Sequence, residues 1–176
     1  MRLDHVGLNV ASLDEMRDWY VGALGLEVEF EFALEAFGFS GAMLRSPEGW
    51  RVELLHRVGN VAGIAVARPM DAALTRGFGH LALAVDDLEA TYDRLLAAGA
   101  ATRMPPSQSP EPGVRIAFVA DPEGNLIELL DRSSAPLVEE GRSPVSKPSD
   151  TQGSLSDHPG FVTGASAPSS TSGGAS

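Results

Sequence analysis

The chain contains no cysteine, a single lysine and no long apolar run, and each of these absences excludes a class of protein. Without thiols, disulfides and thiolate metal sites are excluded, so any metal has to be held by histidine and carboxylate. A formal net charge of −11 argues against a nucleic-acid or anionic-lipid surface, because both need clustered Lys and Arg. No apolar stretch approaches the roughly 18 residues of a membrane span. The opening residues MRLDHVGLNV read as a strand and not as a signal peptide, so we expect a soluble, cytoplasmic protein.

The sequence repeats itself. RSPEGWRVELL at 45–55 matches ADPEGNLIELL at 120–130 at an offset of 122 − 47 = 75. The segments 3–20 and 78–95 match at the same offset, since 80 − 5 = 75. Two matches in one register indicate a duplicated module.

Both copies have the same order of predicted elements: a strand, a helix and three further strands. Helix starts are indicated by Ser12 and by Asp86 or Asp87, and helix ends by Gly25 and Gly99. The expected helices cover 13–24 and 88–98, and the expected strands cover 5–10, 26–33, 37–45 and 50–57, then 80–85, 101–104, 114–120 and 125–131. We therefore predict an α+β fold of two βαβββ modules, related by pseudo-two-fold symmetry, that form a curved mixed sheet around a metal cleft.

These elements divide the chain into a first module at 1–57, a connector at 58–78, a second module at 79–132 and a tail at 133–176. The tail is rich in Ser, Pro, Gly and Thr and has few large apolar residues. Such a segment cannot bury enough surface to offset the entropy lost on ordering. We expect the tail to be disordered.

Two histidines and two glutamates occupy equivalent places in the repeat. His5 and His80 open the first strand of each module, and Glu53 and Glu128 lie in the last strand, with spacings of 53 − 5 = 48 and 128 − 80 = 48. Taken singly, such a histidine is more often structural and such a glutamate more often an exposed edge residue. Their duplicated register favours a metal site in which related modules bring both pairs to one cation. Two imidazoles and two carboxylates suit Zn²⁺, Ni²⁺, Co²⁺, Mn²⁺ or Fe²⁺.

The other two histidines do not join this set. His56 faces away from Glu53 by strand alternation, and His158 lies in the tail, so we expect both to be solvated.

The segments RGFGHLALAVDD (76–87) and AFVADPEGNLIELL (117–130) resemble the second half of glyoxalase I. Residues 1–132 resemble the vicinal oxygen chelate superfamily, which includes glyoxalase I, methylmalonyl-CoA epimerase, extradiol dioxygenases and the bleomycin resistance proteins. The His, Glu, His, Glu set is similar to that of bacterial glyoxalase I, or lactoylglutathione lyase. The resemblance implies a homodimeric enzyme in which His5, Glu53, His80 and Glu128 bind Ni²⁺ or Zn²⁺, or else Co²⁺ or Mn²⁺, and Glu128 or Glu53 doubles as the catalytic base.

The resemblance also implies the reaction. A hemithioacetal of a 2-oxoaldehyde such as methylglyoxal and a thiol becomes a 2-hydroxyacyl thioester, through an enediolate that the metal stabilises. In glyoxalase I an arginine four residues after the first ligand and an asparagine four after the second hold glutathione. Here Asn9 and Arg57 stand at these places with the two side-chain types exchanged. Either this pair binds the substrate from exchanged positions, or the thiol carrier is not glutathione.

Two other functions are compatible with the same family. One is epimerisation of an acyl-CoA thioester by similar chemistry, and the other is metal-free sequestration of a drug, as in the bleomycin resistance proteins. The sequence is compatible with a site inside one chain and with a site shared between two.

Overall fold

The computed structural model describes residues 1–63 and 66–134 of the chain. The first module contains β1 (Val6–Asn9), α1 (Leu13–Leu24), β2 (Glu27–Leu34), a 3-10 turn η1 (Glu35–Phe37), β3 (Phe39–Arg45) and β4 (Arg51–Arg57). The second contains β5 (Leu81–Ala84), α2 (Leu88–Ala97), β6 (Ala101–Gln108), β7 (Arg115–Ala120) and β8 (Leu126–Asp131). A second 3-10 turn, η2 (Pro69–Leu74), lies in the connector.

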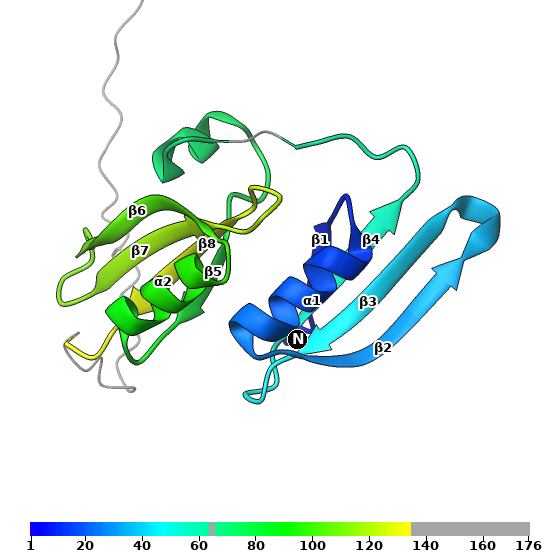
Figure 1. The fold of residues 1–176 in the computed structure, drawn as a ribbon. Helices are drawn as coiled ribbons and strands as arrows, with labels where there is room; N and C mark the ends of the chain where they lie inside the picture. The colour runs from blue at the N-terminus through cyan, green and yellow to red at the C-terminus, as the bar shows by residue number, and fades with distance from the viewer. Residues whose placement is uncertain (64–65, 135–176) are drawn as a thin grey trace, which may run out of the picture. The chain divides into compact units, whose positions relative to one another are not determined.

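Each module forms its own four-stranded mixed sheet, in the orders β1-β4-β3-β2 and β5-β8-β7-β6 (Figure 1). The first strand pairs in parallel with the last, and the other neighbours are antiparallel. A parallel pair needs a crossover connection, and the helix of each module begins that connection. The predicted α+β fold of two βαβββ modules is confirmed.

The helices begin where the local sequence satisfies their free amide groups. The Ser12 side chain accepts from the Glu15 N–H, and the Asp87 side chain accepts from the Ala90 N–H. At the other end Gly25 has a φ of 68°, a left-handed conformation that suits a residue without a Cβ. The predicted start of α1 and its end are therefore confirmed, and the N-cap of α2 is Asp87 and not Asp86.

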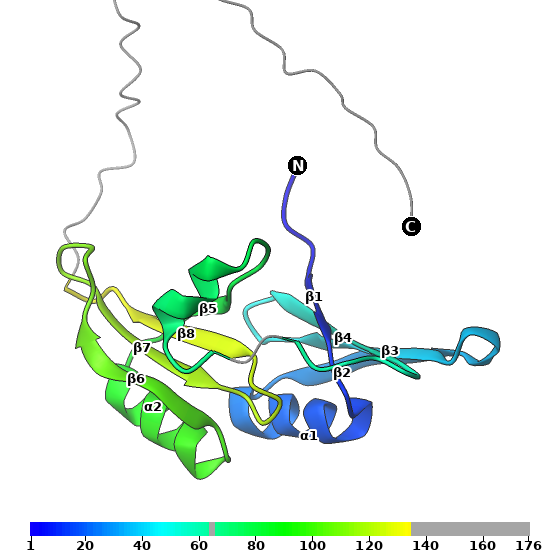
Figure 2. The ribbon, with the colours of Figure 1, turned by 90° about the horizontal axis from the view of Figure 1, so that it is seen from above.

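The two modules share one apolar core, to which both helices contribute. The buried residues of α1 are Met16, Tyr20 and Ala23, and those of α2 are Leu88, Tyr92 and Leu95. Figure 2 shows α1 and α2 side by side. The Trp19 indole N–H donates to the Ala98 carbonyl at 2.8 Å, and a second bond joins Arg94 to the Ala23 carbonyl at 2.7 Å.

Polar contacts join the second module's last turn to the first module. The Glu123 carboxylate accepts from the backbone N–H groups of Ala11 and Ser12 at 2.7 and 2.9 Å. Asp121, which is buried, accepts from the Tyr20 hydroxyl at 3.1 Å. Burial raises the pKa of Asp121, and burial likewise raises the pKa of Tyr20.

Strand β6 is longer than predicted, since it runs to Gln108 through Pro105 and Pro106 instead of ending at residue 104. It is an edge strand, and its pairing with β7 shifts register between Met104 and Ser107. Proline is tolerated at such a place because its missing N–H removes no regular ladder bond. Most of the predicted tail, from residue 135 onward, lies outside the described residues, as does His158. Within the described ranges, every helix is too short or too polar to cross a membrane.

Candidate metal centre

In the first module the parallel pairing of β1 and β4 sets Gly7 opposite Glu53. His5 immediately precedes β1, and its Nε2 lies 3.4 Å from Glu53 Oε2. Gly7 lies directly beside the pair, since a Cβ there would be in van der Waals contact with Glu53 Oε2, at 3.8 Å. The His5 and Glu53 side chains are 36% and 22% exposed, so solvent can reach both.

The second module repeats this arrangement. Ala82 lies opposite Glu128, and His80 precedes β5, with its Nε2 3.0 Å from Glu128 Oε2. The Phe118 ring meets the His80 ring edge-on, with centroids 5.4 Å apart and an interplanar angle of 84°. Phe118 is also the cross-strand partner of Glu128 on β7, so one aromatic side chain flanks both members of the pair.

The structure brings the four predicted ligands together as two pairs and not as one cluster within the chain. Among the described residues, no three His, Asp or Glu side chains gather closely enough to hold a metal ion. A mainly apolar cavity of about 320 Å³ is lined by residues of both modules, with His80 among those of the second. His5, Glu53 and Glu128 do not line it. This cavity is therefore not the predicted metal cleft, and the complete ligand set stays a prediction.

The chemistry of each pair fits a divalent cation. An imidazole nitrogen and a carboxylate oxygen face each other at 3.4 Å in one module and 3.0 Å in the other. Two lone pairs at this distance repel unless a cation lies between them, and either a proton or a metal ion can take that place. A mixed nitrogen and oxygen donor set suits the borderline divalent metals.

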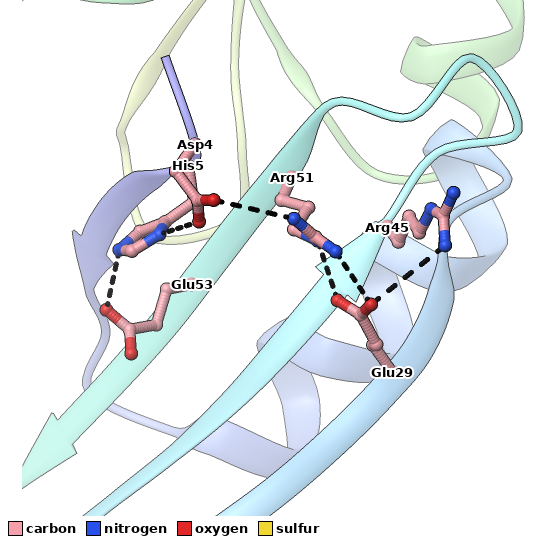
Figure 3. A network of polar contacts seen from close by, with 6 residues as sticks. All are labelled: Asp4, His5, Glu29, Arg45, Arg51 and Glu53. Carbon is pink, nitrogen blue, oxygen red and sulfur yellow. Dashed lines mark hydrogen bonds and ion pairs between the residues drawn. The ribbon is translucent and has the colours of Figure 1, made fainter. Parts of the chain in front are cut away.

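A polar network surrounds the first pair (Figure 3). Asp4 Oδ1 accepts a hydrogen bond from His5 Nδ1 at 2.9 Å, and Arg51 Nη1 lies 3.7 Å from Asp4 Oδ2. Arg51 also donates to both carboxylate oxygens of Glu29, at 2.7 and 2.9 Å. The hydrogen bond between Asp4 and His5 raises the pKa of His5 and lowers the pKa of Asp4.

Sequence reasoning missed Asp4 and Arg51. The available signal was a difference between the copies, because the positions 75 residues later are Gly79 and Leu126. A charged residue that one copy has and the other lacks is not required by the core that both copies share, which indicates a role particular to the first module.

The two predicted substrate-binding residues lie on the same face as the first pair. Asn9 is opposite Leu55, and Arg57 follows Leu55 by two positions on β4, so strand alternation directs both toward the face of Glu53. Both are exposed. His56 points to the other face, as predicted, but it is half-buried, with Nδ1 3.3 Å from the Val10 carbonyl oxygen. His56 is therefore only partly solvated, since its ring lies beside the Val10 carbonyl oxygen.

Comparisons with known proteins agree with this geometry. The family model of the Glyoxalase/Bleomycin resistance protein/Dioxygenase superfamily matches residues 2–129. A probable lactoylglutathione lyase of Vibrio cholerae is 30% identical over 151 residues, covering 80% of this chain and 97% of that protein. A probable lactoylglutathione lyase of Synechocystis is 30% identical over 141 residues, covering 76% and 98%.

Among solved structures, glyoxalase I from Zea mays is similar with a TM-score of 0.60 and 25% identity. The match covers 73% of this chain and 44% of the maize chain, so this chain spans less than half of the maize enzyme. The paired His and Glu residues, the doubled βαβββ fold and these likenesses lead to one conclusion: the chain belongs to the Glyoxalase/Bleomycin resistance protein/Dioxygenase superfamily.

Proposed function

We propose that the protein is a metal-dependent glyoxalase I-like lyase, which converts the hemithioacetal of a 2-oxoaldehyde and a thiol into a 2-hydroxyacyl thioester. The observation that carries the proposal is the pair of equivalent His–Glu contacts, at 3.4 and 3.0 Å. The relatives named probable lactoylglutathione lyase, at 30% identity over most of the chain, support the same reaction.

Four side chains would hold the metal: His5, Glu53, His80 and Glu128. The cation would be Ni²⁺ or Zn²⁺, with Co²⁺ or Mn²⁺ as substitutes, since imidazole and carboxylate ligands accept all four. When bound, the metal supplies a Lewis acid that stabilises negative charge on the substrate oxygens.

The chain's own glutamates move the proton. A carboxylate oxygen of Glu128 takes a proton from one substrate carbon and returns it to the neighbouring carbon, as general base and then general acid. Glu128 suits this role because its side chain is only 16% exposed and lies across from the Phe118 ring, where less water competes for the proton. Glu53 is the equivalent candidate in the first module. Asn9 and Arg57, on the Glu53 face, bind polar groups of the thiol carrier.

The complete site is shared between two chains of a homodimer. One chain offers two separate half-sites, so the first pair of one chain meets the second pair of its partner, and two-fold symmetry generates two identical sites. Exposed large apolar residues on the described surface support such an interface, among them Phe30, Leu34, Phe37, Leu74 and Phe78. A cytoplasmic location is part of the proposal and is tested by localising a tagged protein.

The test is an assay with methylglyoxal plus a panel of thiols, before and after treatment with a chelator. We expect the chelator to abolish activity and Ni²⁺ or Zn²⁺ to restore it. Glu128→Gln should lower kcat by about 10²–10⁴-fold, the usual contribution of a general base. The control is Glu48→Gln, which removes the same charge from an exposed turn.

Three results would contradict the proposal. Activity that survives both the chelator and Glu128→Gln would exclude the metal and the base. Turnover of a chiral 2-methylmalonyl thioester, without activity on any hemithioacetal, would assign the same site to an epimerase. Protein purified without metal that binds a drug would instead indicate sequestration.

A further inference from the structure

The two half-sites have different surroundings on the outer side of the histidine. His5 Nδ1 bonds to Asp4 at 2.9 Å. The position equivalent to Asp4 is Gly79, since 79 − 75 = 4, and glycine has no side-chain acceptor to offer His80. The inner contacts with Glu53 and Glu128 are alike, so the difference concerns only how each imidazole is oriented.

Asp4 is itself held in place by the adjacent strands. Arg51 lies 3.7 Å from Asp4 and is bound by both oxygens of Glu29. Arg51 and Glu53 are two positions apart on β4, so their side chains project from one face of the strand. The chain of contacts therefore runs Glu29, Arg51, Asp4, His5, Glu53, from residues of β2, β4 and the segment before β1, as Figure 3 shows. In the second module Leu126 replaces Arg51, since 126 − 75 = 51, and the chain of contacts is not repeated.

We propose that Asp4 is a positioning residue for His5. Its carboxylate accepts the Nδ1–H, which assigns the proton to Nδ1 and leaves the Nε2 lone pair directed at the space beside Glu53 Oε2. A carboxylate behind a ligating imidazole fixes the orientation of the ring and makes the nitrogen a stronger ligand. This inference rests on the proposed function, because it assigns His5 as a ligand. It implies that the first half-site is oriented before the metal arrives, whereas the second relies on packing against Phe118.

The expected effect is moderate. Loss of an outer partner of a ligating histidine typically weakens metal binding by about 10–100-fold. The Asp4 side chain is 66% exposed, so water can replace part of what it does. We therefore expect a value near the lower end, about tenfold.

The experiment measures Co²⁺ affinity of the full chain by calorimetry, together with the visible spectrum of bound Co²⁺. Asp4→Ala should weaken Co²⁺ binding about tenfold and alter the spectrum. Asp4→Asn should recover part of the affinity, because the amide oxygen accepts the same hydrogen bond. Asp93→Ala is the matched control, since it removes one exposed carboxylate from α2 and should change neither property.

A reciprocal variant tests the same idea in the second module. Gly79→Asp places a carboxylate beside His80, and a Cβ at residue 79 meets no atom within 4 Å. We expect Co²⁺ binding to become tighter, since His80 then gains the partner that His5 has.

The outcomes separate this inference from the function on which it rests. If the unmodified chain binds Co²⁺ but Asp4→Ala binds it equally well with the same spectrum, the positioning role of Asp4 is wrong and the metal site stands. If the unmodified chain binds no Co²⁺, Zn²⁺ or Ni²⁺, the proposed function fails and this inference fails with it. Equal losses in Asp4→Ala and Asp4→Asn would also overturn the hydrogen-bond explanation.

Discussion

The first module orients its histidine with charges, whereas the second orients its histidine by packing. His5 is bound by Asp4, with Arg51 behind it. His80 lies instead against the ring of Phe118, which is 7% exposed. The two His–Glu pairs have similar geometry, while the residues around them differ. A duplicated His–Glu pair can therefore keep its geometry with two different physical supports.

The faces that carry the two pairs also differ. On the second sheet a compact apolar cluster closes part of this face, formed by Val114, Ile116 and Phe118 with Met104 and Leu130 around them. On the first sheet the same face stays open. Phe30 and Leu34 are both 50% exposed, and the Phe32 ring lies over Gly41, where a Cβ would come within 2.6 Å of it. The open face is therefore the better candidate for covering by a partner chain or by substrate.

The largest expected effect is a loss of stability on removing the Phe118 ring, against which His80 packs. Phe118→Ala should lower the free energy of unfolding by about 3–5 kcal/mol, because it leaves a cavity among buried residues. Asp4→Ala should change it by no more than about 0.5 kcal/mol, because Asp4 is on the surface. Urea unfolding of both variants measures the difference. If Asp4→Ala proved the more destabilising change, the contrast between a packed and a charged support would be lost.

An intermediate effect is expected at the turn that joins the modules. Glu123→Ala should cost about 1–3 kcal/mol, because it removes a charged acceptor from the N–H groups of Ala11 and Ser12. The equivalent residue in the first module is Glu48, since 123 − 75 = 48, and its side chain makes no hydrogen bond within the described residues. Glu48→Ala should stay within about 0.5 kcal/mol. If urea unfolding gave the same loss of free energy for Glu123→Ala and Glu48→Ala, the contacts of Glu123 would contribute nothing specific to stability.

The smallest expected effect is a pH dependence of the free energy of unfolding. Hydrogen bonds from Arg115 and Arg132 lower the pKa values of Glu89 and Glu111 in the second module, and Arg51 lowers the pKa of Glu29 in the first. Because these pKa values are lowered, the unfolded chain binds more protons in acid, so this stability is present above the unfolded value of 4.5 and lost as pH falls below it.

Asp121 acts in the opposite direction, because its pKa is raised by burial, so its contribution is lost as pH rises through the folded value. The free energy of unfolding, measured with urea between pH 3 and pH 6, should therefore decline modestly as the pH falls. Glu111→Gln should flatten the decline slightly, whereas Glu48→Gln should leave it unchanged. A chain that became more stable on acidification would contradict the assignment.

Much of the fold could be predicted because its signals are local. The start and end of α1 depend on the adjacent residues Ser12 and Gly25. Because the sequence repeats, the same pattern predicts the elements of the second module. The extension of β6 could not be predicted, since Pro105 and Pro106 are tolerated only because β6 is an edge strand with irregular pairing. Edge position is a property of the whole sheet.

The two pairs were predictable for a similar reason, and the network around one of them was not. Equal spacing within the repeat identified His5 with Glu53 and His80 with Glu128. The partners of Arg51 depend on the register of three strands, including the bulge between Val28 and Phe30 that contains Glu29. Nor could spacing decide whether the pairs meet in one chain, because that depends on how whole modules pack.

The most direct test of a shared site combines two inactive chains. His5→Ala and His80→Ala chains with different affinity tags are co-expressed, and the heterodimer is isolated through both tags. In a shared arrangement one of its two sites keeps all four ligands, so it should hold about half the metal and half the activity of the unmodified dimer, whereas each variant alone has neither. A heterodimer without metal and activity would contradict the account, because every chain in it carries a broken pair and could not complete a site by itself.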